Sequence, residues 1–356
     1  MRACSPRTCS GNCPTPWPRC VDVYTLPTMA NRPHTDIRTI PANAYVEGVY
    51  SIVNPQIGTT RAGKSYLKCL LRDATGEIVT RQWSFDEASL GDLSAAGFVW
   101  ASGHTQVYNG QIQFIAEQVK PVDVDEDELA ALLPSTKFDI DKMFDEVRSI
   151  LATISHPALK SLADTYLADE ELMGAFRRCP AAVSVHHAFI GGLLEHTLQL
   201  LKLAGVILPM YPLLSRDLVI MGLFLHDMGK TVELKWEKGF DYTTEGNLIG
   251  HVVRGAIWLP VKAALAAKAS GERIPPDVLR VLQHIILTHH GLPEHGAVKL
   301  PATPEAIFIA MLDNLDAKTA TALAHTRSDS VRESDGPFTE KVWALGTRLY
   351  RPDPLK

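Results

Sequence analysis

Several histidines and aspartates of this chain stand where they could together bind a metal ion. His226 and Asp227 follow the apolar run 218–225, and an aspartate after such a run is costly to bury without a partner. A metal ion would be such a partner. Imidazole nitrogen combined with carboxylate oxygen suits Mn, Fe, Zn or Co rather than Ca. One His-Asp pair is weak evidence, so the hypothesis depends on the other candidates along the chain.

Those other candidates form an ordered series, in which each member lies on or at the end of a separate predicted helix. The full set is His196, His226, Asp227, His251, the pair His289 and His290, and Asp313. Helical bundles build metal sites from inward-facing residues on neighbouring helices. We therefore predict that this set converges around divalent metal.

Hydrophobic periodicity predicts the elements that would position these residues. From about residue 135 onward the pattern is helical. The predicted helices are 138–154, 157–176, 191–207, 215–228, 248–269, 276–289 and 304–325. Ser215 and Asp217 offer N-terminal capping groups for the fourth helix, and Gly229 is a stop signal after it. The second half of the chain is therefore predicted to be all-α.

Residues 39–122 show the alternation and the turn signals typical of β-strands. The predicted strands are 44–53, 65–72, 76–85, 97–108 and 111–119. Asn109-Gly110 is a hairpin signal between the last two. Five short strands in about 85 residues indicate a small closed barrel such as an OB-fold.

The second predicted strand carries an aromatic and basic face formed by Tyr66, Lys68 and Arg72. Trp83 and Phe85 repeat the aromatic spacing on the next strand. Single-stranded nucleic acid binds such a face, because bases stack on the rings and phosphates pair with the cations. The alternative is that some of these aromatics fill the barrel.

The overall composition places few limits on function. The chain has 356 residues, 46% of them apolar and 21% charged, which fits a soluble protein of two domains. The net charge of -5 gives no global attraction for nucleic acid, so positive potential must be local or come from metal ions. No apolar run approaches the roughly 18 residues that span a bilayer. A cytoplasmic protein without membrane contact is therefore predicted.

The first residues are unlike the rest. Cys4, Cys9, Cys13 and Cys20 lie among prolines and lack paired C-x-x-C spacing. A disordered tail is predicted, with a zinc knuckle or a disulfide knot as the alternatives. Met29 leaves open whether residues 1–28 belong to the native chain.

The ordered histidine and aspartate pattern resembles the HD superfamily of metal-dependent phosphohydrolases. Longer segments resemble the YhaM-type 3′–5′ exoribonucleases, a family that joins an N-terminal OB-fold to an HD domain. The segments are PAAVSVHHAFIGGLLEHT (180–197), LHDMGK (225–230), TEGNLIGH (244–251) and DNLDAK (313–318). One departure is Gly-Ala-Val at 296–298, where the family tends to have Gly-Ser-Pro; no metal ligand is affected.

The sequence predicts an α+β multidomain protein in four parts, of which only the tail has no counterpart in the family. These are the tail (1–34), an OB-fold nucleic-acid-binding domain (35–122), a linker (123–136) and an all-α HD phosphohydrolase domain (137–350). The resemblance also implies two metal ions, with Mn²⁺ expected and Fe²⁺, Co²⁺ or Mg²⁺ as alternatives.

The resemblance assigns roles to the candidate residues. His196, His226, Asp227 and Asp313 would hold one ion. Asp227 would bridge to a second ion held by His251 and by one of His289 and His290. Lys230, one helical turn from His226, is predicted to act with Asp227 in catalysis by contacting a phosphate oxygen, with a solvated lysine at a helix end as the alternative. His186 and His187 are candidates for contact with the substrate phosphate or the leaving group, with a structural role as the alternative.

The implied activity is removal of nucleoside monophosphates from the 3′ end of single-stranded RNA, with single-stranded DNA as a further candidate substrate. A homo-oligomer is left open. One alternative is an HD phosphohydrolase of small nucleotides, which would need no extended aromatic face. Another is a nucleic-acid-binding protein whose HD domain is not catalytic.

Overall fold

The computed structural model describes residues 32–60, 62–83, 85–108, 111–125, 128–129, 132–183, 187–236, 239–327 and 336–355. The Cys/Pro-rich tail, the Asn109-Gly110 turn and His186 lie outside these residues. Pro33–Lys356 forms one compact unit, the second of two divisions of the chain. Both domains predicted from the sequence lie in the second unit.

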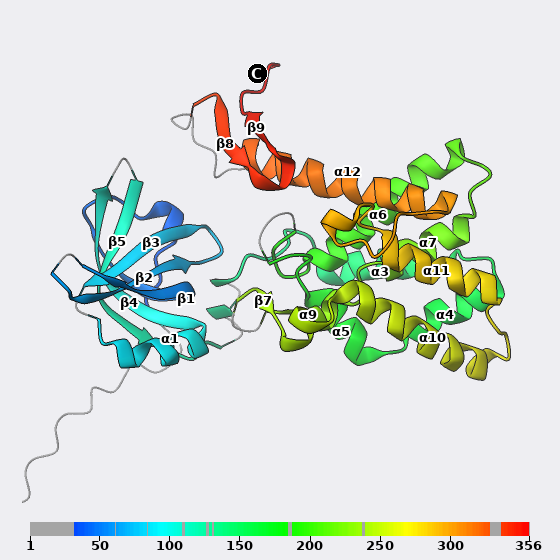
Figure 1. The fold of residues 1–356 in the computed structure, drawn as a ribbon, viewed down its shortest axis with the longest axis horizontal. Coiled ribbons are helices and arrows are strands. Elements are labelled where there is room, and N and C mark those ends of the chain that lie inside the picture. The colour runs from blue at the N-terminus through cyan, green and yellow to red at the C-terminus, as the bar shows by residue number, and fades with distance from the viewer. Residues whose placement is uncertain are drawn as a thin grey trace, which may run out of the picture. The chain divides into compact units, whose positions relative to one another are not determined.

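The N-terminal domain is a closed barrel with the strand order β1-β2-β3-β5-β4 (Figure 1). The strands are β1 Tyr45–Thr59, β2 Ser65–Arg72, β3 Glu77–Trp83, β4 Phe98–Tyr108 and β5 Gln111–Pro121. A short parallel pairing of β3 with β5 closes the barrel. The helix α1, Leu90–Ala96, stands between β3 and β4 in the chain. This is the topology of an OB-fold, and it confirms the predicted barrel.

Alternation along β2 separates the barrel core from the outer face. Leu67, Cys69 and Leu71 are buried, whereas Lys68 is exposed. Phe85 is only 9% exposed and belongs to the core, so its predicted place on the binding face is wrong. Because β3 ends at Trp83, the alternation does not reach Phe85.

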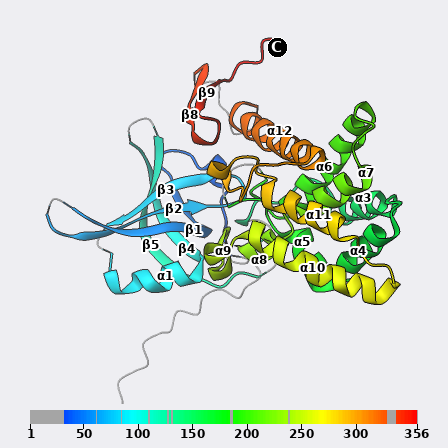
Figure 2. The ribbon, with the colours of Figure 1, turned by 45° about the vertical axis from the view of Figure 1, so that its right-hand side comes forward.

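The C-terminal domain is mainly helical (Figures 1 and 2). Its longer helices are α3 Ile140–Ala152, α4 Pro157–Leu167, α5 Glu170–Arg178, α6 Gly192–Ile207, α7 Arg216–Leu225, α10 His251–Ser270, α11 Pro276–Thr288 and α12 Pro304–Thr326. Two shorter helices are α8 Lys230–Glu233 and α9 Thr244–Leu248. Helices α6, α7, α11 and α12 pack against one another around an apolar core.

Local capping explains where some helices differ from the prediction. The predicted helix 157–176 is two helices, because the Asp169 carboxylate caps α5 by accepting from Leu172 N. Asp217 does not cap its own helix; its carboxylate accepts from the amides of Ser155 and His156, just before α4. The predicted helix 248–269 corresponds to α10, which begins at His251, whereas Leu248 is the last residue of the separate short helix α9.

Two small antiparallel sheets correct the prediction of an all-α domain. They pair β6 Leu234–Lys235 with β7 Asp241–Tyr242, and β8 Phe338–Val342 with β9 Thr347–Tyr350. These strands are too short to leave a clear alternating pattern. The turn η6, Trp343–Leu345, joins β8 to β9, and both η6 and β9 pack on α12.

Among the described residues, one helical segment is long and apolar enough to cross a bilayer by composition alone. Gly192–Met210 has a mean hydropathy of 1.2 and is half buried. The segment includes α6, which packs in the core, as apolar helices of folded domains commonly do.

Candidate metal centre

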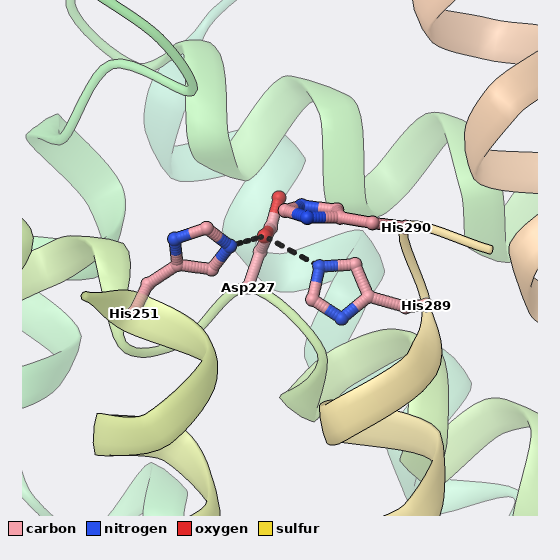
Figure 3. A group of neighbouring side chains, drawn as sticks. All are labelled: Asp227, His251, His289 and His290. Carbon is pink, nitrogen blue, oxygen red and sulfur yellow. Dashed lines mark ion pairs between the residues drawn. The ribbon is translucent and has the colours of Figure 1, made fainter. Parts of the chain in front are cut away.

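The predicted ligands converge on the carboxylate of Asp227. Its Oδ1 lies 3.4 Å from His251 Nε2 and 3.4 Å from His289 Nε2 (Figure 3). Its Oδ2 lies 3.4 Å from His226 Nε2 and 3.8 Å from His196 Nε2. Two atoms that each stand about 2.1 Å from one ion are separated by about 3.0–3.4 Å. The carboxylate therefore lies between two sets of imidazoles at near-coordinating separations.

The other two predicted ligands join the same cluster. His290 offers a ligand atom within 4.8 Å of those of Asp227, His251 and His289. Asp313 Oδ1 lies 3.3 Å from the Nε2 of His196, on the other side of the cluster. The structure thus brings together all the predicted ligand residues, and both members of the His289-His290 pair are in reach.

Separate helix ends position this cluster. His226 and Asp227 follow α7, His251 is the first residue of α10, and His289 follows α11. Gly229 explains how the turn after α7 approaches α10. A Cβ at Gly229 would meet the backbone oxygen of His251 at 2.2 Å, so no side chain fits there.

Backbone carbonyls orient two of the imidazoles. His226 Nδ1 lies 2.7 Å from Leu223 O, and His289 Nδ1 lies 2.8 Å from Ile286 O. A carbonyl can only accept, so each Nδ1 carries the proton and donates. In the neutral ring the lone pair then lies on Nε2, which is directed at the cluster, as a metal ligand requires.

Carboxylates orient the other two. His196 Nδ1 lies 2.7 Å from Asp316 Oδ2, and His251 Nδ1 lies 2.7 Å from Glu233 Oε2. Sequence reasoning did not assign these two acids. Asp316 was within reach of prediction, because it follows Asp313 by three residues and so shares its helix face. Glu233 gave no comparable signal.

Four buried atoms of the cluster have no hydrogen-bond partner among the described residues. They are Asp227 Oδ1, His251 Nε2, His289 Nε2 and His290 Nδ1. Buried polar atoms are nearly always paired, so one isolated case needs an explanation and four together need a common one. A divalent cation would satisfy all four at once, and the donor set fits such an ion.

The charge of the centre also favours a cation. Asp227, Asp313, Asp316 and Glu233 contribute four carboxylates, against two cations: the ammonium of Lys230, which donates to Asp227 Oδ2 at 2.7 Å, and the His196 ring. Burial opposes ionisation of Asp227, but Lys230 and the neighbouring imidazoles hold its pKa well below the usual range. Buried negative charge of this size needs positive partners.

Two imidazoles have strongly shifted pKa values. Burial alone would lower the pKa of His196, but its contacts with Asp313 and Asp316 raise it to about 9. Burial, together with His289 and His251, lowers the pKa of His290 to about 2. His290 is therefore neutral at physiological pH and able to offer a lone pair.

His187 lies next to the centre rather than in an open substrate site. Its side chain is 6% exposed, and its Nε2 lies 3.1 Å from Asp316 Oδ2. This placement does not support its predicted contact with a substrate phosphate. His187 and His196 instead share Asp316, whose Oδ2 contacts both rings.

The remaining predicted residues lie on the barrel. Tyr66 and Trp83 are cross-strand neighbours with ring centroids 4.9 Å apart, and Trp83 is 48% exposed. Lys68, two residues after Tyr66 on β2, is exposed. Arg72 is half-buried and its guanidinium pairs with Glu77, so its charge is already partly neutralised.

Residues 193–318 match the HD domain family. Together with the barrel, this defines a hydrolase of the HD class that carries an N-terminal OB-fold. Two curated relatives are named 3′-5′ exoribonuclease YhaM. The relative from Bacillus pumilus (strain SAFR-032) is 32% identical over 304 residues, covering 83% of this chain and 91% of the relative. The relative from Bacillus subtilis (strain 168) is 31% identical over 298 residues, with the same coverage of 83% and 91%. The chain belongs to the YhaM exoribonuclease family, which confirms the resemblance.

Solved structures similar to this chain include two small proteins. One is the second OB-fold domain of replication protein A from Methanococcus maripaludis, with a TM-score of 0.21 and 14% identity over 26% of this chain and 96% of that chain. The other is the mitochondrial single-stranded DNA binding protein Rim1 from S. cerevisiae, with a TM-score of 0.19 and 15% identity over 23% of this chain and 99% of that chain.

Proposed function

We propose that this protein is a metal-dependent 3′–5′ exoribonuclease that releases nucleoside monophosphates from single-stranded RNA. The observation that carries the proposal is the set of four buried atoms around Asp227 that have no hydrogen-bond partner among the described residues. Membership of the YhaM family supports the 3′ polarity and the RNA substrate. Two divalent ions are proposed, with Mn²⁺ first and Fe²⁺, Co²⁺ or Mg²⁺ as alternatives.

Divalent ions bound here would activate a water molecule, by lowering its pKa to about 7, and would stabilise charge on the phosphate. Asp227 is the proposed bridge between them, because its two oxygens face different imidazoles. His196, His226 and Asp313 would complete one ion, and His251, His289 and His290 the other. Their fixed rings would hold the ions without reorganisation during the reaction.

Lys230 is the proposed phosphate contact. In the structure its ammonium donates to Asp227 Oδ2, and its side chain is 13% exposed. Ions at Asp227 would compete for that oxygen, leaving the ammonium to pair with a non-bridging phosphate oxygen. Lys230 is the first residue of α8 and follows Asp227 by three residues, so it stays beside that carboxylate in either arrangement.

The barrel face is the proposed contact for the rest of the strand. Tyr66 and Trp83 form an exposed aromatic pair, on which bases could stack, and Lys68 supplies a cation beside them. Arg72 would contribute less, since Glu77 already pairs with it. Single-stranded DNA is a further proposed substrate. The cytoplasmic location and the homo-oligomer stay predictions.

Digestion of end-labelled RNA tests this proposal. RNA blocked at its 5′ end should be shortened stepwise in Mn²⁺, whereas RNA blocked at its 3′ end should stay intact. Chelator or Asp227→Ala should stop both digestion and product release, while Asp241→Ala on the exposed β7 strand serves as a matched control. Unchanged digestion by Asp227→Ala, or digestion of 3′-blocked RNA, would contradict the proposal.

A further inference from the structure

A cavity of about 230 Å³ adjoins the metal centre on the side of α12. The residues it shares with the centre include Lys230, His290 and Asp313. From there it runs along one face of α12, where Ala317 and Thr321 follow Asp313 at steps of four residues. The cavity therefore begins at the proposed reacting phosphate and extends away from it.

The lining changes in character along the cavity. The end at the metal centre has charged groups that suit a phosphate. The other end is lined by Ala317, Thr321 and two residues of the turn η6, Ala344 and Leu345. Small and apolar side chains there suit a sugar or a base, which carries no net charge. Lys318 lies on the same helix between these ends and could pair with an outer phosphate oxygen.

The volume limits what can enter. Drug-sized ligands occupy cavities of roughly 300–1,000 Å³, so 230 Å³ has room for about one nucleoside and not for two. The outer wall comes from η6, which lies between β8 and β9 and packs on α12. A segment near the C-terminus thus bounds a space that starts at the metal centre.

We propose that this cavity takes the 3′-terminal nucleoside of the RNA strand, with Ala317 and the η6 residues Ala344 and Leu345 as its walls. The inference rests on the proposed function and specifies its substrate site. The scissile phosphate lies toward Asp227, and the single nucleoside beyond it becomes the monophosphate product. A second nucleotide on the 3′ side would meet the η6 wall, so the enzyme removes one residue at a time.

Filling the cavity tests this inference. Ala317→Phe places a ring in the nucleoside space without altering a proposed metal ligand. Uridine 5′-monophosphate and inorganic phosphate are the probes, titrated calorimetrically into the Mn²⁺-loaded protein. The unsubstituted protein should bind the nucleotide at least about 10-fold more tightly than phosphate, and the variant should bind the two within about twofold. kcat/KM for RNA should fall about 100-fold, because the terminal phosphate is misplaced.

Two further variants keep the test decisive. Ala324→Phe, on an exposed part of the same helix, should behave like the unsubstituted protein in binding and digestion. Ala344→Phe fills the cavity from η6 and should reproduce Ala317→Phe even where that substitution disturbs α12. Mn²⁺ content, measured by mass spectrometry, should be unchanged in all three.

The outcomes separate this inference from the proposed function. If Ala317→Phe and Ala344→Phe both retain the preference for nucleotide over phosphate, the cavity is not the nucleoside site and the inference is overturned. If the unsubstituted protein shows that preference but leaves RNA intact, the exoribonuclease proposal fails while the nucleoside site stands. Loss of the preference in both variants, with full Mn²⁺ content, supports the inference.

Discussion

Two buried acids hold the rings on which the metal centre depends. Glu233 contacts Nδ1 of His251 with its side chain and accepts from the backbone amide of the same residue at 3.0 Å. Asp316 holds His196 in a similar way through Oδ2. These acids do not face the proposed ions, yet they fix which nitrogen each ring presents.

Substitution of Glu233 should therefore weaken metal binding without removing a ligand. Glu233→Gln keeps the size of the side chain but loses the charge that supports the His251 proton. Outer partners of this kind are worth about 10–100-fold in metal affinity, so Mn²⁺ should bind one of two sites that much more weakly. Equilibrium dialysis with metal quantification measures this. Glu272→Gln, at an exposed position, is the control, and equal affinities for both variants would argue against the role of Glu233.

A separate pair of residues should make the stability of the barrel depend on pH. His34 Nε2 lies 3.4 Å from the buried carboxylate of Asp73 and 3.5 Å from the exposed carboxylate of Asp36, and its ring contacts Tyr50. The contact with Asp73 raises the pKa of His34 above its ordinary 6.5, although burial opposes this. Hydrogen bonds hold the pKa of Asp73 below its usual range despite burial.

The sign follows from the raised pKa of His34. A group whose pKa is higher in the folded state stabilises the fold fully below its unfolded pKa and loses that contribution as pH rises through the folded value. The free energy of unfolding should thus differ more between the unsubstituted protein and His34→Gln at pH 5.5 than at pH 9. Urea titrations with chelator present measure both. A difference that grows toward pH 9 would show that the pair does not act in this way.

For single residues, the sequence predicts the metal ligands better than it predicts the groups that orient their rings. His226 and Asp227 follow an apolar helix, and that pattern is visible without a structure. The carbonyls that orient His226 and His289 lie three residues before each ring, so they are local and follow from the helix end. Glu233 acts on His251 from 18 residues away, and only the tertiary fold creates that contact.

At the scale of helices and turns, the packing of two elements positions the ligands, and Gly229 is the clearest case. It has φ -65°, so no left-handed conformation requires glycine there. What requires it is the close approach of the turn after α7 to the first residue of α10, where a Cβ would meet His251 O at 2.2 Å. The turn and α10 are held together at the point where Asp227 faces His251.

Gly229→Ala should consequently separate these two elements. The backbone atom at 2.2 Å cannot move alone, so α10 or the turn must shift, and His251 with it. Rearrangements of about 1 Å cost about 100-fold in rate. Digestion of labelled RNA should slow by that order. Gly205→Ala, in α6 with nothing near its Cβ position, is the control, and an equal rate for both would contradict the packing argument.

The barrel makes a comparable prediction for RNA binding. The Tyr66 ring lies over Gly58 on β1, where an added Cβ would meet the ring at 2.3 Å. Tyr66 also contacts Trp83 on β3, the strand on the other side of β2. Stacking is worth about 1–3 kcal/mol per base, so Tyr66→Ala should weaken binding of a labelled oligoribonucleotide by about 5- to 150-fold. Fluorescence anisotropy in chelator measures this without digestion. Tyr211→Ala, outside the barrel, should leave affinity unchanged. If Tyr66→Ala binds the oligoribonucleotide as tightly as the unsubstituted protein does, this face is not the RNA-binding surface.

Elements with strong periodicity were predictable, and their exceptions have local causes. The strand Ser65–Arg72 agrees with the prediction at both ends. The helix Leu90–Ala96 was missed, since it is short and includes a glycine at its second position. Phe85 was assigned to the wrong surface because the end of β3 could not be located by alternation alone.

At the scale of the whole molecule, the net charge of -5 gives the proposed metal ions an electrostatic role in addition to their role in catalysis. The centre contributes three buried carboxylates and the half-buried carboxylate of Asp313, so without cations it would repel an RNA strand. In this account the ions neutralise the centre, the barrel holds the strand by stacking, and the α12 cavity receives its last nucleoside. The order of the two domains was predictable, whereas the cavity and its η6 wall were not, because they depend on short elements without periodicity.

Anomalous X-ray diffraction from Mn²⁺-soaked crystals, collected at the manganese absorption edge, is the most direct test of the central claim. Two peaks are expected, one on each side of the Asp227 carboxylate. One should lie within bonding distance of His226 Nε2 and the other within bonding distance of His251 and His289 Nε2. Full manganese soaking with no peak within bonding distance of Asp227 would contradict the account.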